Sequence, residues 1–141
     1  MRGFMKNAAF ALIAMPIAAM ACGDRAVVST TKKDGTKVGL VITSEQVESG
    51  IKWNPEQGEP PLSISQVYRK VQHWARAEYS RYDRVEVREI ALTKMGCSLV
   101  EDFWYYQVDL IPVFDGNEVW GSGNWAAVLM DGTVIGTTEV P

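Results

Sequence analysis

The clearest periodicity in the chain is helical and lies between residues 62 and 79. The apolar residues at helical spacing, which form one stripe facing a core, are Ile64, Val67, Tyr68, Val71, Trp74, Ala75 and Tyr79. Ser63 and Gln66 stand at the spacing of a capping box, and Leu62 precedes them at the position of a hydrophobic staple. The pattern predicts an amphipathic helix that begins just after Ser63.

After this helix the pattern changes to the alternation typical of strands. Within residues 84–92 the apolar phase shifts by one position near Arg88 and Glu89, as a β-bulge would cause. Residues 103–114 predict a long strand in which alternate residues from Trp104 to Leu110 share one face. We expect the other face to be wet, and Pro112 to lie at an edge or a bulge.

The chain ends in a predicted hairpin, in which residues 126–130 and 133–135 flank the turn Asp131-Gly132. A helix followed by a run of antiparallel strands indicates an α+β fold. We expect one amphipathic helix packed on a curled antiparallel sheet of about four strands, within a domain spanning residues 61–141.

The preceding segment, residues 22–60, is less regular. Asp34-Gly35 between β-prone runs predicts an N-terminal hairpin with a weak first arm. Residues 44–61 contain two glycines and three prolines, a composition that excludes a long regular element. We expect residues 22–60 to be a tether that carries this hairpin and a Pro/Gly-rich loop.

The first 21 residues have the layout of a secretory signal peptide. Arg2 and Lys6 precede an uncharged run, residues 7–21, which ends in Ala19-Met20-Ala21. The run is shorter than the roughly 20 apolar residues of a membrane-spanning helix. We therefore expect export to the bacterial periplasm or cell envelope.

Cys22 follows the expected cleavage site directly. Ala21-Cys22 resembles the lipobox of bacterial lipoproteins, although Ala19 replaces the usual leucine. This resemblance implies lipidation of Cys22 and membrane attachment through its lipid. The alternative for Cys22 is a secreted form without a lipid, in which Cys22 could form a disulfide bond to Cys97. The alternative for Cys97 is a small buried residue near the end of a strand.

Charge and motifs exclude several kinds of chemistry. From Cys22 onward the formal net charge is −5, which disfavours nucleic-acid binding. With His73 as the only histidine and no cysteine pair at ligand spacing, we expect no metal site. Gly121-Ser122-Gly123 is neither a nucleophile elbow nor a phosphate loop, so we expect no catalytic residue and no cofactor.

Tryptophans and one carboxylate are the candidates for a binding surface. Trp53, Trp120 and Trp125 lie in or beside expected loops, where aromatic side chains could contact a partner. Asp109 lies on the polar face of the long strand. The alternative is packing for the tryptophans, and for Asp109 a cross-strand pair with Lys or Arg.

The order of these motifs resembles that of PepSY-like domains. The resemblance covers roughly residues 61–140 and rests on the capped helix at Ser63, on Trp104 to Asp109, and on the hairpin at Asp131-Gly132. The long connection at 115–124 departs from the family pattern. The resemblance implies a module that binds or inhibits peptidases in the cell envelope. It carries over no catalytic residue. Cystatin-like and nuclear-transport-factor-2-like folds share this arrangement of a helix packed on a curled sheet.

We therefore expect a non-enzymatic envelope module, lipid-anchored through Cys22, that binds or inhibits a peptidase or another envelope protein. One alternative is a small hydrolase or lyase with a pocket between helix and sheet, which would need a polar group such as Asp109 or His73 facing a cavity. Another is a purely structural envelope protein.

Overall fold

The computed structural model describes residues 23–97 and 99–141. The expected signal peptide and Cys22 lie outside these residues. In chain order the elements are β1 (Arg25–Thr31), β2 (Lys37–Ile42), α2 (Ser44–Ser49), the 3₁₀ turn η1 (Pro55–Gln57), α3 (Ile64–Glu78), β3 (Arg84–Lys94), β4 (Trp104–Phe114), β5 (Asn117–Glu118), β6 (Trp125–Leu129), β7 (Val134–Gly136) and β8 (Thr138–Glu139).

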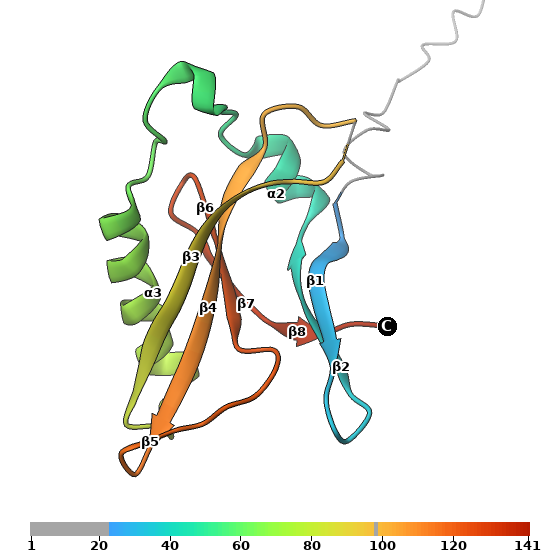
Figure 1. Cartoon of the computed structure of the whole chain (residues 1–141). Helices are drawn as coiled ribbons and strands as arrows, with labels where there is room; N and C mark the ends of the chain where they lie inside the picture. The colour runs from blue at the N-terminus through green and yellow to red at the C-terminus, as the bar shows by residue number, and fades with distance from the viewer. Residues whose placement is uncertain (1–22, 98) are drawn as a thin grey trace, which may run out of the picture.

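The strands form two antiparallel sheets, which makes the fold α+β as expected. The larger sheet has the order β3-β4-β6-β7, with β5 pairing to β4, and the smaller sheet has the order β1-β2-β8. Figure 1 shows α3 on one side of the larger sheet and the β1–β2 hairpin on the other. The second sheet and the short helix α2 add to the single helix and single sheet that the sequence predicted.

Helix α3 begins as its sequence predicts. Ser63 and Gln66 make both hydrogen bonds of the capping box, and Leu62 is buried in the same core as Val67 and Val71. Ile64 and Tyr68, which we expected to face that core, are 63% and 48% exposed. The buried stripe is therefore narrower than the apolar pattern.

The two faces of β4 are both covered. Tyr106 and Val108 face α3 in the first core, whereas Tyr105 belongs to a second core with Leu40 and Ile42 of β2. The expectation of a wet face on this sheet is wrong, because the N-terminal hairpin turns its alternate apolar residues onto it. Part of the segment expected to be a tether thus supplies core side chains.

The β3–β4 ladder contains a bulge near Arg88 and a proline at position 112. Its register shifts between Val87 and Glu89, which confirms the predicted bulge near Arg88. Pro112 lies in β4 opposite Val85, and on its other side it falls between the end of the β6 pairing at Asp109 and the β5 pairing at Val113. The Val85 carbonyl accepts a hydrogen bond from the Gln72 side chain, so it points away from β4, and the ladder needs no N–H at Pro112.

The last strands join the two sheets. The predicted hairpin forms, with β6 paired to β7 around Asp131-Gly132 and a Leu129 N–H to Thr133 carbonyl hydrogen bond of 2.9 Å. The chain then crosses to the smaller sheet, where β8 pairs with β2. In the described part of the chain, no helix is both long and apolar enough to cross a membrane.

Candidate functional site

Trp53 does not contribute to a binding surface. It is 5% exposed and meets Trp104 edge-on, with ring centroids 6.0 Å apart. Its backbone N–H donates to the Asp102 carbonyl at 2.8 Å, which fixes the loop against the β3–β4 connection. The expectation that Trp53 lies at a binding surface is wrong, because its large apolar side chain is buried against Trp104 of the sheet.

Two of the other three candidate residues, Asp109 and Trp120, lie beside Arg88. The Arg88 guanidinium lies 3.6 Å from an Asp109 carboxylate oxygen and 4.8 Å from the ring centroid of Trp120. Trp125 is the register partner of Asp109 and is half-buried against the second core. Asp109 is thus the cross-strand partner of an arginine, and the same guanidinium also contacts the ring of Trp120.

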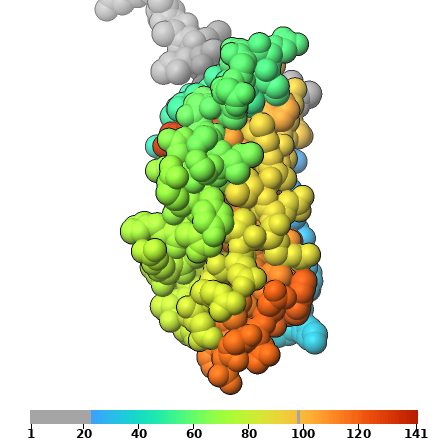
Figure 2. Space-filling model, turned by 60° about the vertical axis from the view of Figure 1, so that its left-hand side comes forward, coloured from blue at the N-terminus to red at the C-terminus, as the bar shows by residue number. Residues whose placement is uncertain are grey.

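A concave feature lies between α3 and β3, and we call it the α3–β3 groove. One part, of about 450 Å³, is lined by Tyr68 and Gln72 of the helix and by residues 84–87 of the strand. The other part, of about 280 Å³, shares Gln72, Arg84 and Val85 and extends to the end of α3. Figure 2 shows the helix and the strand side by side along this face.

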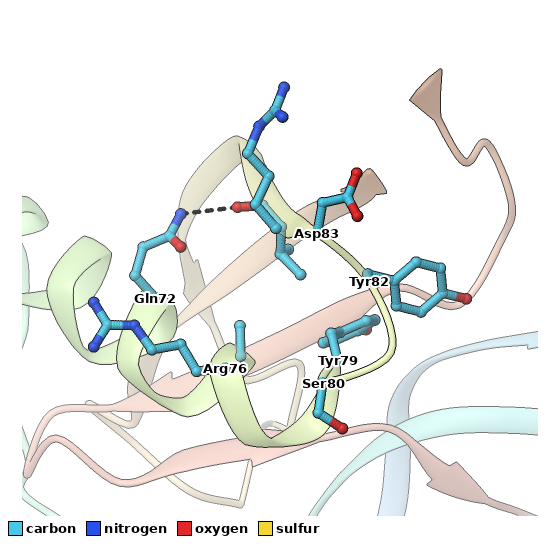
Figure 3. Close-up of a pocket in the computed structure, with 9 residues that line it drawn as sticks. Gln72, Arg76, Tyr79, Ser80, Tyr82 and Asp83 are labelled. Atoms are coloured by element: carbon cyan, nitrogen blue, oxygen red, sulfur yellow. Dashed lines mark hydrogen bonds between the residues drawn. The ribbon is translucent and has the colours of Figure 1, made fainter. Parts of the chain in front are cut away.

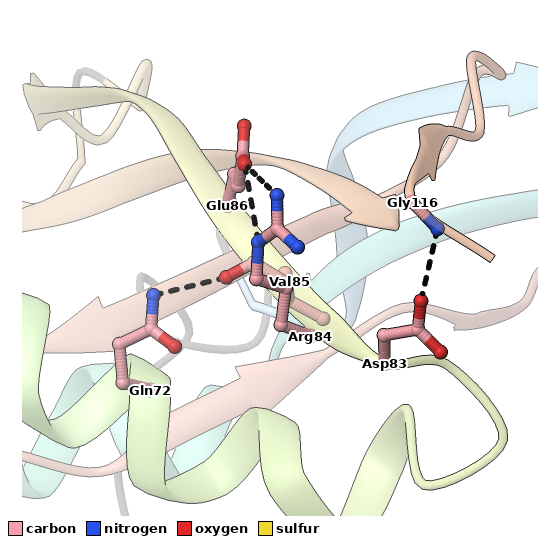
Figure 4. A network of polar contacts seen from close by, with 6 residues as sticks. All are labelled: Gln72, Asp83, Arg84, Val85, Glu86 and Gly116. Atoms are coloured by element: carbon pink, nitrogen blue, oxygen red, sulfur yellow. Dashed lines mark hydrogen bonds and ion pairs between the residues drawn. The ribbon is translucent and has the colours of Figure 1, made fainter. Parts of the chain in front are cut away.

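Gln72 fixes the width of the α3–β3 groove. Its Nε2 donates to the carbonyl oxygen of Val85 at 3.0 Å, across from helix to strand (Figure 4). Just before β3, the Asp83 carboxylate accepts a hydrogen bond of 3.2 Å from the Gly116 backbone N–H. This bond holds the start of β3 against the β4–β5 turn. The groove is therefore built on regular elements joined by hydrogen bonds.

One part of the groove reaches the end of α3, where Gln72 and Arg76 of the helix line it together with Tyr79, Tyr82 and Asp83 (Figure 3). Burial raises the pKa of Tyr79 to about 12, with smaller contributions from the negative charges of Tyr82 and Glu78. Tyr79 therefore stays protonated at neutral pH, and its hydroxyl lies 3.3 Å from the Asn124 side-chain oxygen, to which it donates.

Arg76 is the charged residue of the groove that is available to a ligand. Arg84 pairs with Glu86 at 2.9 Å, and the Asp83 carboxylate accepts the Gly116 N–H. Arg76 is exposed and makes no ion pair within the described residues. An anionic group entering the groove at this end would therefore meet an arginine that no ion pair among the described residues occupies.

The groove was not identified from the sequence, although signals for its parts were present. Gln72 is a polar residue at the border of the apolar stripe of α3, and Tyr68 widens that stripe beyond what one sheet face can cover. Neither signal says that the neighbouring strand is at the edge of its sheet. Over the described ranges, no group of three or more His, Cys, Asp or Glu side chains is placed to hold a metal ion.

Cys97 is disulfide-bonded. The sequence contains one other cysteine, Cys22, which lies outside the described residues. A thioether lipid on Cys22 and a disulfide bond to it would require the same sulfur atom.

Comparison of the chain with known protein families, with curated proteins and with solved structures finds no match in any of the three.

Proposed function

We propose that this protein is a non-enzymatic binding module of the bacterial cell envelope, which binds or inhibits a peptidase or another envelope protein. The observation that carries the proposal is the α3–β3 groove. It combines an exposed tyrosine, a strand at the edge of its sheet and an arginine that makes no ion pair in the described part of the chain. Concave sites with a few placed polar groups are the usual sites of recognition.

The positions of two polar residues favour binding over catalysis. His73 is exposed on α3, and the Asp109 carboxylate is engaged by Arg88. A hydrolase or lyase with a pocket between helix and sheet would need a buried polar group such as one of these facing a cavity. In addition, Trp74 and Trp104 pack against the first core, in the space between α3 and the sheet.

Placement in the envelope rests on the N-terminal sequence, with its expected signal peptide at residues 1–21 and Cys22 after it. The resemblance to PepSY-like domains supports a peptidase as partner, through the capped helix α3 and the Asp131-Gly132 hairpin. We propose two exclusive forms of the mature chain. One has a Cys22–Cys97 disulfide bond, which accounts for the bonded Cys97, and the other is lipidated on Cys22, so that a disulfide bond of Cys97 would have to join another molecule.

Two measurements test this function. Mass spectrometry of the chain isolated from a bacterial host, with and without reduction, distinguishes a lipid mass on Cys22 from a disulfide. Cleavage elsewhere, or no cleavage, would contradict the proposed envelope form.

The second measurement compares the partners captured from envelope extract by the wild type, by Tyr68→Lys in the groove, and by Trp120→Ser on the Arg88 cluster as a matched surface control. We expect reproducible partners that are lost with Tyr68→Lys and kept with Trp120→Ser. Equal capture by all three proteins would show that the groove is not the binding site, and no reproducible capture would refute a binding function.

A further inference from the structure

Strand β3 leaves one side of its backbone open. Among the described residues it pairs with β4 alone, and ten of its 11 residues have a register partner there. At one end the Val85 carbonyl points away from β4, because it accepts from Gln72. Just beyond the other end, the Met95 N–H points toward β4, because it donates to the Phe103 carbonyl at 2.9 Å.

The alternation of a strand then decides which backbone groups are open. Counting back from Met95, the N–H and C=O groups of Lys94, Leu92 and Ile90 point outward, and those of Thr93 and Ala91 point to β4. Counting forward from Val85, the groups of Val87 also point outward. The bulge near Arg88 separates Val87 from Ile90, so the longest regular open run is residues 89–94.

The side chains beside this open run offer apolar contacts. Ile90 and Leu92 are the register partners of Val108 and Tyr106, which face α3, so these side chains lie on the α3 side of the sheet. Leu92 and Tyr68 are both exposed, as is Ile64 one helical turn before Tyr68. An extended segment along the edge would therefore find apolar surface on one of its two faces.

Hydrogen bonds and charge mark where such a segment would end. Gln72 already occupies the Val85 carbonyl, which closes the ladder there. Arg76, one helical turn further along α3, makes no ion pair within the part of the chain that the structure describes. The open edge thus leads toward Arg76, a cation that makes no ion pair among the described residues.

We propose that an extended segment of a partner polypeptide adds as a strand to the open edge of β3 and presents a carboxylate to Arg76. This proposal rests on the proposed binding function and names its mode. Main-chain hydrogen bonds supply affinity in strand addition, and alternate side chains supply specificity. The bulge near Arg88 shortens the open edge, as in edges that avoid indiscriminate pairing.

The probe is an acetylated decapeptide of alternating Val and Thr with Glu at both ends, compared with the same peptide carrying Lys at both ends. Amide hydrogen exchange followed by NMR at millimolar peptide reports on each backbone group. We expect added protection at Ile90, Leu92 and Lys94, and little change at Ala91 and Thr93, whose N–H groups already bond to β4.

Two matched peptide controls isolate the hydrogen bonds. N-methylation of every second residue in one phase removes the N–H groups that pair with β3, and in the other phase removes those that face solvent. One phase should abolish binding and the other should preserve it. Equal binding by both phases, or no added protection at the three edge amides with either peptide, would overturn strand addition.

Two protein variants complete the test. Leu92→Pro removes an outward N–H at an edge position, where proline is tolerated, and it should keep the fold by circular dichroism while abolishing peptide protection. Arg76→Glu should weaken the Glu peptide about 5-fold, in keeping with an exposed ion pair, and strengthen the Lys peptide.

These variants also separate this proposal from the function on which it rests. If Leu92→Pro still captures the envelope partners that Tyr68→Lys loses, strand addition is wrong and the binding function stands. If protection of the edge amides appears without peptide and rises with protein concentration, the occupant is a second copy of this chain, and the proposed partner segment is wrong.

Discussion

Truncation of Leu40 in β2 tests whether the N-terminal hairpin is part of the core. Leu40 is fully buried in the second core, among side chains of β4 and β6. Replacing a buried leucine by alanine removes transfer free energy and leaves a cavity, at a cost of about 2–5 kcal/mol. Because domains of this kind are stable by only about 5–15 kcal/mol, Leu40→Ala should lose a large fraction of the free energy of unfolding.

The assay is urea unfolding followed by tryptophan fluorescence, with thermal unfolding by circular dichroism. For a domain of this size we expect Leu40→Ala to lower Tm by about 10–20 °C. Ile42→Val, at a neighbouring position that is also fully buried, should cost about 1 kcal/mol. This milder variant keeps the test readable if Leu40→Ala does not fold.

Ile64→Ala is the matched control. Ile64 is as large and apolar as Leu40 but lies exposed on α3, so its truncation should change stability by no more than about 0.5 kcal/mol. If Leu40→Ala were no more destabilising than Ile64→Ala, the hairpin would not cover the sheet. Residues 22–60 would then behave as the tether that their composition suggested.

Three further changes probe other parts of the fold. Ser63→Ala should cost about 1 kcal/mol in urea unfolding, because it removes the cap of α3. Gly136→Ala should cost about 1–3 kcal/mol, because its Cβ would lie 2.7 Å from a Trp74 ring carbon, whereas Gly121→Ala, with its nearest contact at 3.9 Å, should not. Stability should fall as pH rises from 10 to about 12, because the unfolded chain loses the Tyr79 proton before the folded one. Tyr79→Phe should lessen that fall, and an unchanged pH profile would contradict the assignment.

Helix α3 shows how much the local pattern can predict. Its start follows from Ser63 and Gln66, whose hydrogen bonds involve neighbours three residues away. Its buried face follows from helical spacing at Val67 and Val71. The pattern erred at Ile64, because apolar spacing says which face is inward but not how much of that face the sheet reaches.

The residues expected at a binding surface show what the local pattern does not predict, namely their tertiary contacts. Trp53 lies in a loop of the sequence pattern, but its side chain belongs to the core. Asp109 was a candidate binding residue, but its carboxylate pairs with Arg88 on the neighbouring strand. These outcomes depend on neighbours about 20 to 50 positions away in the chain. A single sequence does not show which distant side chain will reach a given loop or strand.

The sequence by itself determined the helix, the long strand, the bulge in β3 and the last hairpin, because each is encoded by residues within a few positions of one another. The tertiary structure alone decided that the hairpin covers the second face of β4, that β8 returns to pair with β2, and that β3 stands at an edge beside α3. Those features follow from pairings such as Val38 with Glu139, which join the two ends of the fold. The groove exists because the strand order of residues 23–97 and 99–141 leaves β3 without a second neighbouring strand, and no local periodicity records strand order.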